Sequence, residues 1–489
     1  MATSATIELK SCPLYINGKP VLSHGPKDIQ YNPATGEAVA EIPRTTPEEI
    51  SAAVEAARKA FPSWSRTPVI QRAKVLFKYR ELLEAHADEF IALITEENGK
   101  TIEEARGSFQ RGIENIEFAC GAPTFMMGET VEQVGTGVDG WSTRNPIGVC
   151  VGITPFNFPF MVPLWMFPMA IVCGNTFVLK PSDKVPRTAV RLVELFHEAG
   201  LPAGVLNLVH GAKSTVDALL TDPRVKAVSF VGSSAVARYI YQTASHNGKR
   251  VQALGGAKNH SVVLPDAEMK STVGAIMGSG FGCAGERCLA TSVIVAVGEA
   301  ADPLVKELVR AADNLNVGAG CEARTQMGPV ITDEAKKRIL GYIELGEKEG
   351  ATLARDGRKD AVSKGAGYFV GPTIFDHVNP GSRIAKEEIF GPVLSVIRVK
   401  DLKEALAVID NSEYGNAASV FTRSGAAARE FTQNVGAGMV GINVGVPAPV
   451  AFFSFTGWKN SFFGDLHALG KDSVHFYTEQ RVVTCRWPD

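Results

Sequence analysis

The stretch GSGFGCAGERCLATS (residues 278–292) places two cysteines in a small, glycine-rich setting, with Arg287 immediately before Cys288. A catalytic thiol needs backbone that a substrate can approach closely and a neighbouring cation that favours the thiolate. Cys288 is therefore a candidate nucleophile for covalent catalysis through sulfur. Taken alone, the stretch also fits a helix start with buried cysteines, and Cys283 keeps that simpler interpretation.

Further strings along the chain place polar or glycine residues at turns, and each has an ordinary structural explanation. Asn157 can tie down a loop, and Lys180 can be a solvated surface charge. Gly232 can turn the chain between a strand and a helix, and Glu388 can cap a turn. None of these strings contains the GxGxxG fingerprint of an ordinary dinucleotide site. The strings are TPFNFP (154–159), KPSD (180–183), SFVGSS (229–234), ALGGAKNH (253–260) and EEIFGPV (387–393).

Together with AGERC (284–288), these strings resemble the aldehyde dehydrogenase superfamily in order and spacing, over nearly the whole chain. The resemblance implies that Cys288 adds to an aldehyde carbonyl. It also implies that the side-chain amide of Asn157 and the backbone N–H of the cysteine stabilise the resulting oxyanion. Hydride transfer to nicotinamide would then leave a thioester on the enzyme.

The same resemblance implies an NAD site. Lys180 matches the lysine that holds the adenine ribose, and Glu388 matches the glutamate that holds the nicotinamide ribose. Gly232 and Ser233 open the helix that faces the pyrophosphate. Asp183 stands where many relatives have glutamate, and we expect NAD rather than NADP. The cofactor-binding residues implied are Thr154, Phe156, Lys180, Asp183, Gly232, Ser233 and Glu388, and no metal is expected.

Ala253 departs from the pattern of aldehyde dehydrogenases that release a free acid. Those enzymes carry glutamate at this position, where it activates the water that hydrolyses the thioester. Alanine can abstract no proton, so the thioester should wait for a better nucleophile, and a free thiol is one. The departure favours coenzyme A as the acyl acceptor and co-substrate.

Several longer segments resemble the methylmalonate-semialdehyde dehydrogenase branch of the superfamily. In that branch Arg111 and Arg287 match a pair that binds the distal carboxylate of the substrate, for which guanidinium groups are suited. The acyl-enzyme then loses CO₂ before transfer to coenzyme A, which gives propionyl-CoA or acetyl-CoA. Arg111 could instead be an ordinary exposed helix residue. The segments are RGIENIEFACGAP (111–123), MMG (126–128), FSFTGWKNSFFGDLHA (453–468) and HFYTEQRVVT (475–484).

Glu286 departs from this branch, in which glutamine usually stands two residues before the nucleophile. A carboxylate near the thiol would raise the pKa of that thiol, and we expect Glu286 to face away from it.

Three other functions stay open: a hydrolytic aldehyde dehydrogenase, an acylating enzyme for simple aldehydes, and a binding protein without turnover. The choice between malonate and methylmalonate semialdehyde stays open, as does the pathway, with valine, inositol and β-alanine breakdown as the alternatives.

Composition supports small-molecule partners. The 489 residues carry a formal net charge of -2, so no basic field favours nucleic acid or an anionic membrane. The eight cysteines form no CxxC pair or zinc-finger spacing, and no secretory signal is visible. We expect a cytoplasmic protein, with a processed mitochondrial form as the alternative. Residues 145–179 contain no charge, but Pro155, Pro159, Pro163 and Pro168 should break any long helix there. We therefore expect a strand, a loop and a core helix rather than a membrane span.

The elements that position these residues follow an α/β pattern. Thr46-Pro47-Glu48-Glu49 predicts a helix start with a capping box. Short β-branched runs then alternate with helical segments, which predicts two units with parallel sheets and a boundary near residues 250–260. The resemblance implies a Rossmann-type cofactor domain, an α/β catalytic domain and a small strand extension in a homotetramer built as a dimer of dimers. The expected ranges are 1–128 and 149–254 for NAD binding, 255–455 for catalysis, and 129–148 with 456–489 for oligomerisation.

Overall fold

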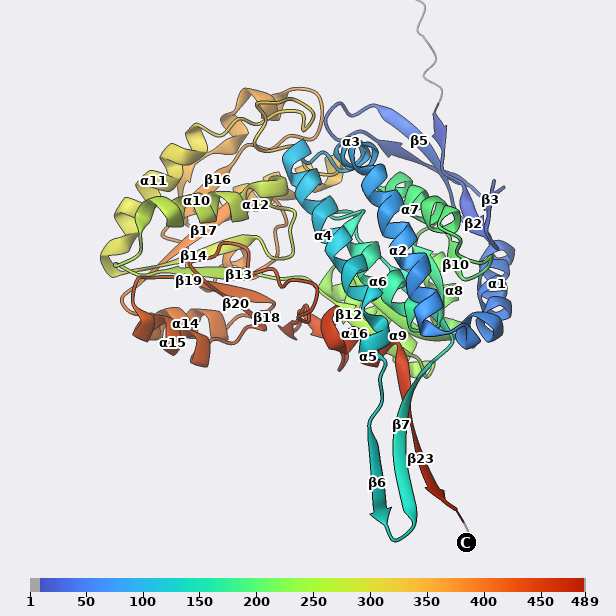
Figure 1. Ribbon diagram of the computed structural model, residues 1–489. Helices are drawn as coiled ribbons and strands as arrows, with labels where there is room; N and C mark the ends of the chain where they lie inside the picture. The colour runs from blue at the N-terminus through green and yellow to red at the C-terminus, as the bar shows by residue number, and fades with distance from the viewer. Residues whose placement is uncertain (1–8, 488–489) are drawn as a thin grey trace, which may run out of the picture.

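The computed structural model describes residues 9–487. Figure 1 shows two α/β bodies side by side, one blue to green and the other yellow to orange, and a long arm that projects from the first body. Each body is built on its own mainly parallel sheet, and the arm is a third sheet of three strands. The alternation of strands and helices in the sequence therefore predicted the fold class correctly.

The first body contains an eight-stranded sheet whose five central strands are parallel and whose edge strands are antiparallel. The central strands are almost entirely buried, as expected where helices cover both faces of a parallel sheet. The order across the sheet is β22 (Phe462–Phe463), β12 (Arg250–Leu254), β11 (Val225–Val231), β8 (Val149–Ile153), β9 (Thr176–Lys180), β10 (Leu206–Leu208), β2 (Leu14–Ile16) and β3 (Lys19–Val21).

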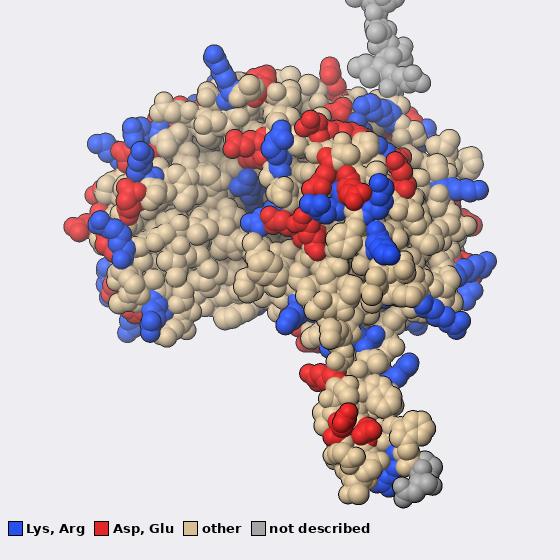
Figure 2. Space-filling view, in the orientation of Figure 1, with Lys and Arg blue, Asp and Glu red and all other residues tan. Residues whose placement is uncertain are grey.

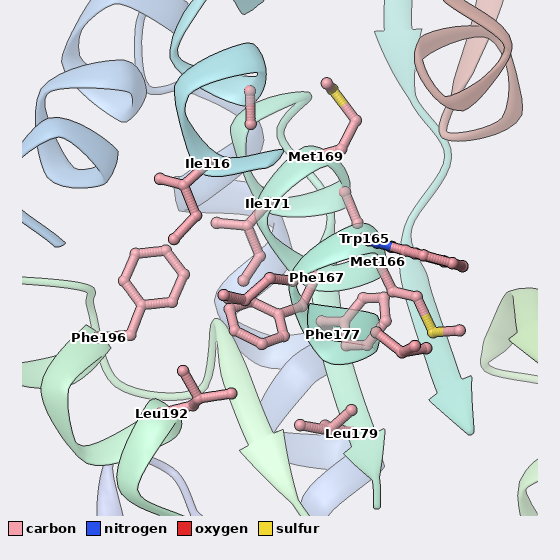
Figure 3. Packing of buried hydrophobic residues seen from close by; sticks show 14 of the residues in the cluster. Ile116, Trp165, Met166, Phe167, Met169, Ile171, Phe177, Leu179, Leu192 and Phe196 are labelled. Atoms are coloured by element: carbon pink, nitrogen blue, oxygen red, sulfur yellow. The ribbon is translucent and has the colours of Figure 1, made fainter. Parts of the chain in front are cut away.

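Helix α6 (Met161–Val172) lies in the core of this body, between β9 and the N-terminal helices α2 (Val69–Ala85) and α4 (Ile102–Cys120). Figure 3 shows the ring of Phe167 on α6 beside those of Phe177 on β9 and Phe196 on α7 (Pro186–Glu198). The ring centroids lie 6.4 Å and 5.7 Å from that of Phe167. The apolar segment is thus covered by protein on all sides, which explains why it carries no charge.

The expected strand, loop and core helix are present as β8, residues 154–160 and α6, with Pro155 and Pro159 in the loop. The two prolines within α6 do not break it. Pro163 lies in the first turn of α6, where the backbone N–H has no intrahelical acceptor, and Pro168 lies inside the helix without ending it. Dense packing of the surrounding core offsets the lost hydrogen bond. Among the described residues, no helix is both long and apolar enough to cross a membrane.

The second body contains a seven-stranded sheet, antiparallel only at its first strand. The chain enters it directly after β12 through residues 255–258, within the interval in which we expected the boundary. Its order is β15 (Thr352–Arg355), β16 (Thr373–Asp376), β17 (Val393–Val399), β14 (Thr291–Val297), β13 (Asn259–Val263), β19 (Ala417–Phe421) and β20 (Met439–Ile442).

The arm consists of β6 (Thr130–Gly135), β7 (Val138–Pro146) and β23 (Thr478–Arg486), paired antiparallel (Figure 1). We expected residues 456–489 to belong to the oligomerisation extension, but of those that the structure describes only β23 pairs with the arm. Residues 458–459 form β21, which pairs with β18 (Tyr414–Gly415), and β22 joins the first sheet. Helix α16 (Gly470–Phe476) packs on α6. Val474 and Phe476 of α16 are buried, and of these C-terminal elements only β23 belongs to the arm.

The remaining elements cover the two sheets and form a small sheet with the order β1-β5-β4 near the N-terminus. They are β1 (Lys10–Ser11), β4 (Lys27–Tyr31), β5 (Ala38–Pro43), β21 (Trp458–Lys459), α1 (Pro47–Arg66), α3 (Ala87–Asn98), α5 (Ala122–Phe125), α8 (Lys213–Thr221), α9 (Ser234–His246), α10 (Met269–Gly280), α11 (Ala301–Asp313), α12 (Asp333–Lys348), α13 (Arg383–Lys386), α14 (Leu402–Asp410) and α15 (Gly425–Asn434), with 3-10 turns at Gly282–Gly285, Gly298–Ala300, Gly357–Lys359 and Ala361–Lys364.

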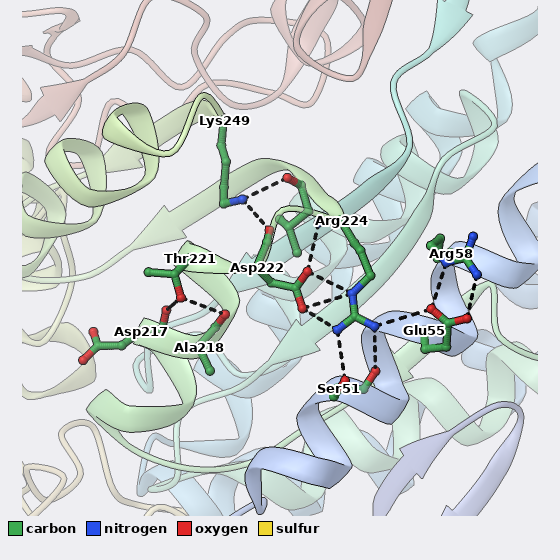
Figure 4. Close-up of polar contacts among 10 residues, drawn as sticks. Ser51, Glu55, Arg58, Asp217, Ala218, Thr221, Asp222, Arg224 and Lys249 are labelled. Carbon is green, nitrogen blue, oxygen red and sulfur yellow. Dashed lines mark hydrogen bonds and ion pairs between the residues drawn. The ribbon is translucent and has the colours of Figure 1, made fainter.

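The start of α1 carries the predicted capping box: Thr46 Oγ1 accepts from the N–H of Glu49, whose carboxylate accepts from the N–H of Thr46. Arg224, which lies in the turn before β11, contacts α1 further along that helix (Figure 4). It donates to Asp222, to the hydroxyl of Ser51 and to Glu55. These contacts fix α1 against the turn that leads into β11, an inner strand of the first sheet. Figure 2 shows acidic and basic side chains interspersed over the visible face, consistent with a net charge near zero.

A buried carboxylate fixes α7 on α3. Glu97 is fully buried and accepts from the backbone N–H groups of Arg187 and Thr188, the Thr188 hydroxyl and the Gln30 amide, at 2.6–2.9 Å. Glu97→Leu should lower the free energy of unfolding of this body by about 3 kcal/mol, because these buried donors lose their acceptor. Thermal or urea denaturation measures the loss.

The neighbouring Glu96 provides the control, because it forms a part-exposed ion pair with Arg187 at 2.8 Å. Glu96→Leu should cost no more than about 1 kcal/mol. Equal losses for the two variants would contradict the assignment of Glu97 as the buried cap of α7.

Candidate active site

Two cavities meet at Cys288, which lines both. The larger one, of about 860 Å³, lies between residues 153–157, the start of α9 and the loop that carries Glu388. The smaller one, of about 330 Å³, lies between α4, α6 and residues 446–455. A thiol at such a junction can react with a group that enters from either side.

The backbone before Cys288 is tightly bent. Cys283, Ala284 and Gly285 have φ values of 49°, 51° and 73°. This left-handed backbone conformation is unfavourable for residues other than glycine. A Cβ on Gly285 would lie 2.3 Å from the carbonyl oxygen of Gly391, so glycine is required there. The backbone N–H of Cys283 donates to Glu104 Oε1 at 2.6 Å, which anchors the bend to the start of α4.

Two asparagines hold the carbonyl group of Cys288. Asn259 Nδ2 and Asn416 Nδ2 each donate to this oxygen at 2.8 Å. The Asn259 amide also bonds Ala290 and Ala417, so it is fixed in orientation. We did not single out either asparagine from the sequence, although Asn259 belongs to the ALGGAKNH string.

The electrostatic setting of the thiol differs from our expectation. Burial, followed by the charge of Glu388, raises the pKa of Cys288 to about 12. Arg287 lowers this pKa only weakly, because its guanidinium points at the neighbouring thiol: Nε donates to Cys283 Sγ at 3.2 Å. The expected activation of Cys288 by Arg287 is therefore minor, and the thiol is protonated at neutral pH.

Asn157 is brought next to the cysteine loop. Its Nδ2 donates to the backbone carbonyl of Glu286 at 2.9 Å, and the backbone carbonyl of Asn157 accepts from Lys100 Nζ at 2.6 Å. Lys100 is 1% exposed and lies 4.0 Å above the ring of Phe158. Burial lowers the pKa of this lysine. Sequence reasoning missed Lys100, because an isolated lysine after a glycine gives no signal of burial.

The larger cavity collects most of the residues expected to bind the cofactor. Asp183 is the exception: it does not line the cavity. Its Oδ1 lies 3.6 Å from Lys180 Nζ and accepts from the N–H of Gly211 at 3.1 Å. Its neighbours Ser182 and Lys184 line the cavity instead. The expected residues that do line it are Thr154, Phe156, Lys180, Gly232, Ser233 and Glu388.

Glu388 lies on the wall between the two bodies. Its Oε1 accepts from the N–H of Ala257 at 2.9 Å, and burial raises its pKa to about 7. Lys258 is buried nearby and donates to the carbonyl of Glu387 at 2.7 Å. Burial lowers the pKa of Lys258 to about 7 as well, although the nearby glutamates act in the opposite direction. The cavity wall therefore holds a carboxyl group that titrates near neutral pH.

The smaller cavity brings the two predicted arginines to the same space as Cys288. Each already has an acidic partner. Arg111 Nη1 donates to Glu114 at 2.8 Å, and Arg287 Nη2 lies 3.4 Å from Glu104. The cavity thus holds two arginines beside the thiol, each paired with a glutamate that lines the same cavity.

Comparisons with known proteins agree with this geometry. The model of the aldehyde dehydrogenase family matches residues 23–483. Malonate-semialdehyde dehydrogenase 1 of Geobacillus thermodenitrificans (strain NG80-2) is 57% identical over 474 residues, which are 97% of this chain and 98% of that protein. The chain belongs to the aldehyde dehydrogenase family.

Solved structures give the same result. The crystal structure of methylmalonate-semialdehyde dehydrogenase from Oceanimonas doudoroffii has a TM-score of 0.97 at 52% identity and covers 98% of this chain and 99% of that one. A Sinorhizobium meliloti protein solved in complex with NAD has a TM-score of 0.96 at 46% identity, with 99% of both chains covered. The resemblance proposed from the sequence strings is confirmed.

In this aldehyde dehydrogenase, Ala253 carries only a methyl group at the position of the expected general base. It is fully buried in β12 and lines neither cavity, whereas Gly255 and Gly256 line the larger one. A Cβ on Gly256 would lie 2.4 Å from Glu388 Oε2, so a side chain there would displace the Glu388 carboxylate. Segment 253–258 contains no acidic residue, so it offers no carboxylate as a general base.

Glu286 is buried, and its Oε1 accepts from the N–H of Ile331 at 3.3 Å. It lines neither cavity that Cys288 lines, in accord with our expectation that it faces away from the thiol. Burial raises the pKa of Glu286 to about 8, although Lys184, Arg338 and Lys100 oppose this shift. The carboxyl group is therefore mostly protonated at neutral pH.

Glu286→Gln should leave the pH dependence of Cys288 alkylation by iodoacetamide unchanged, because the side chain points toward Ile331. The variant should also gain stability relative to the native protein as pH rises through about 8. A carboxyl group whose pKa is raised on folding stabilises the fold below its unfolded pKa and loses that contribution above its folded pKa. Alkylation rates and melting temperatures between pH 6 and 9 measure both effects. An altered alkylation profile would show that the carboxyl group acts on the thiol.

Proposed function

We propose that this aldehyde dehydrogenase oxidises malonate or methylmalonate semialdehyde with NAD through a thioacyl-enzyme on Cys288, and transfers the decarboxylated acyl group to coenzyme A. The observation that carries the proposal is that Cys288, Arg111 and Arg287 line one cavity of about 330 Å³. An aldehyde that bears a carboxylate can place its carbonyl at the thiol and its charge at the guanidinium groups. The names of the similar proteins support the same substrate class.

The larger cavity fits NAD. Its volume of about 860 Å³ suits a dinucleotide, and the N-terminal end of the 13-residue helix α9 faces it beside Gly232 and Ser233, where backbone N–H groups favour a pyrophosphate. Lys180 would hold the adenine ribose and Glu388 the nicotinamide ribose, with Thr154 and Phe156 against the ring system. When bound, NAD accepts the hydride. Asp183 would act through Lys180, which it orients.

The chain supplies the covalent steps. The Cys288 thiol releases its proton to water in the cavity, and the sulfur adds to the aldehyde carbonyl. The oxyanion takes hydrogen bonds from the backbone N–H of Cys288 and from Asn157 Nδ2. An amide nitrogen carries two hydrogens, so Asn157 can bond the oxyanion while it keeps its bond to Glu286. The bond from Lys100 to the Asn157 carbonyl fixes the loop during this step.

The choice of coenzyme A as the acyl acceptor rests on the acidic groups around the thioester. In the described part of the chain, the carboxylates that line the two cavities are Glu388, Glu104 and Glu114. Glu104 and Glu114 are paired with arginines, and Glu388 is bonded to Ala257. With no carboxylate on residues 253–258, water lacks the base that free-acid enzymes place there, and a thiol nucleophile is favoured.

We also propose that NAD binding and catalysis belong to different bodies. Residues 1–128 and 149–254 would bind NAD, residues 255–455 would carry catalysis, and the arm would form the oligomer. The arm exposes Val131, Val134, Trp141 and Val482, apolar side chains that a second copy could cover. A homotetramer is the expected assembly and stays a prediction, as does a cytoplasmic location.

The deciding experiment measures NADH formation from malonate semialdehyde with and without coenzyme A and identifies the product by mass. CoA-dependent turnover to acetyl-CoA is the expected result. Equal turnover to a free acid without coenzyme A would mean that another group activates water and would contradict the acyl transfer. Faster oxidation of propanal than of malonate semialdehyde would contradict the substrate class.

A further inference from the structure

Helix α4 presents a polar stripe to the smaller cavity. Ser108, Arg111 and Asn115 follow one another at helical spacing on the face that also carries Glu104, and all four residues line the cavity. The opposite wall is apolar. It is formed largely by Phe158, Met161, Trp165, Phe455 and Leu469. Ser108 and Asn115 have no part in the mechanism described above.

Both residues keep a polar atom without a partner. Ser108 is 3% exposed and Asn115 is 8% exposed. Ser108 Oγ and Asn115 Oδ1 accept or donate no hydrogen bond within residues 9–487, while Asn115 Nδ2 donates to the Arg111 carbonyl at 2.7 Å. A buried polar atom without a partner is unfavourable, so a ligand that supplies the complementary group binds with a gain in free energy.

The charges of the cavity select the class of ligand. Arg111 uses one of its five N–H donors on Glu114 and is about two-fifths exposed, so it can turn. Arg287 is held more firmly, by Cys283, Gly278 and Glu104. Glu104 and Glu114 line the same cavity and balance the two arginines. A carboxylate, which only accepts hydrogen bonds, can take the unused donors of Arg111 and accept from the free Ser108 hydroxyl.

We infer that Ser108 and Asn115 determine specificity for the carboxylate of the substrate. The Ser108 hydroxyl donates to a carboxylate oxygen. Asn115 Oδ1 accepts from the guanidinium of Arg111 when that group turns from Glu114 to the substrate. The spacing allows this, because positions 108 and 115 flank position 111 by three and four residues on one helix face. The inference rests on the proposed function, whose substrates carry this carboxylate.

The test compares kcat/KM for malonate semialdehyde with kcat/KM for propanal, which has no carboxylate. Ser108→Ala should lower the first value roughly tenfold or more, as expected for a lost hydrogen bond to a charged group, and change the second less than about twofold. Asn115→Asp should lower the first value at least as much, because it puts a negative charge beside the carboxylate. Alanine is a strong helix former, so Ser108→Ala preserves α4.

Thr95→Val is the matched control. Thr95 Oγ1 is also buried without a partner, yet Thr95 does not line the cavity. Its removal should leave the ratio of the two kcat/KM values unchanged. Equal losses on both aldehydes in Ser108→Ala, or no loss on either, would overturn the inference. A native protein that prefers propanal would overturn the proposed function instead, so the two failures are distinguishable.

Discussion

Replacing Cys288 with alanine is expected to reduce NADH formation from malonate semialdehyde by more than about 10,000-fold, because the covalent intermediate can no longer form. Loss of the nucleophile should leave binding of NAD intact, since the larger cavity is lined by many other residues. Steady-state assays measure the first effect, and quenching of protein fluorescence by NAD measures the second. Residual turnover within tenfold of the native rate would exclude Cys288 as the nucleophile.

Cys321→Ala provides the control, because Cys321 is an exposed free cysteine. This variant should keep native activity. The pKa of about 12 for Cys288 adds a pH test: in the absence of NAD, the thiolate fraction and the rate of alkylation by iodoacetamide should rise about tenfold per pH unit between pH 7 and 10. A plateau near pH 7 would show that a cation activates the thiol after all.

Arg111→Ala should lower kcat/KM for malonate semialdehyde by about 30- to 1,000-fold, which corresponds to roughly 2–4 kcal/mol for a lost ion pair with the substrate carboxylate. The value for propanal should change little, because propanal has no charge to bind. The enzyme would thus shift toward simple aldehydes. Steady-state kinetics on the two substrates measure the shift.

Two variants sharpen this test. Arg111→Lys should recover part of the loss, since lysine keeps the charge but not the planar pair of donors. Arg106→Ala removes an exposed arginine one and a half turns earlier on α4, outside the cavity, and should be neutral. A similar loss in Arg106→Ala and Arg111→Ala would mean that a general electrostatic effect, rather than a contact with the substrate, accounts for the change.

The sequence by itself determined the fold class and the family, and it named the candidate site residues. Strand and helix periodicities identify the two α/β bodies, and the capping box at Thr46 marks the start of α1 as the structure has it. Cys288, Asn157 and Glu388 lie in local strings whose order could be compared with a family. Such features are readable because each is encoded within a few neighbouring residues.

Only the tertiary structure decided which way long side chains point and which distant residues meet. Arg287 is next to Cys288 in the chain, yet its guanidinium bonds Cys283 and Glu104, so adjacency did not imply activation of the nucleophile. Asp183 lies in a matching string but orients Lys180 instead of lining the cavity.

Residues without a local signal were missed for the same physical reason. Lys100 bonds Asn157 across 57 positions, and Asn416 reaches Cys288 across 128. Ser108 and Asn115 are ordinary helix residues until the packing of α4 against α6 turns them into a cavity wall. Local sequence encodes backbone periodicity and motif identity, whereas burial, ion pairing and pKa depend on contacts between segments far apart in the chain.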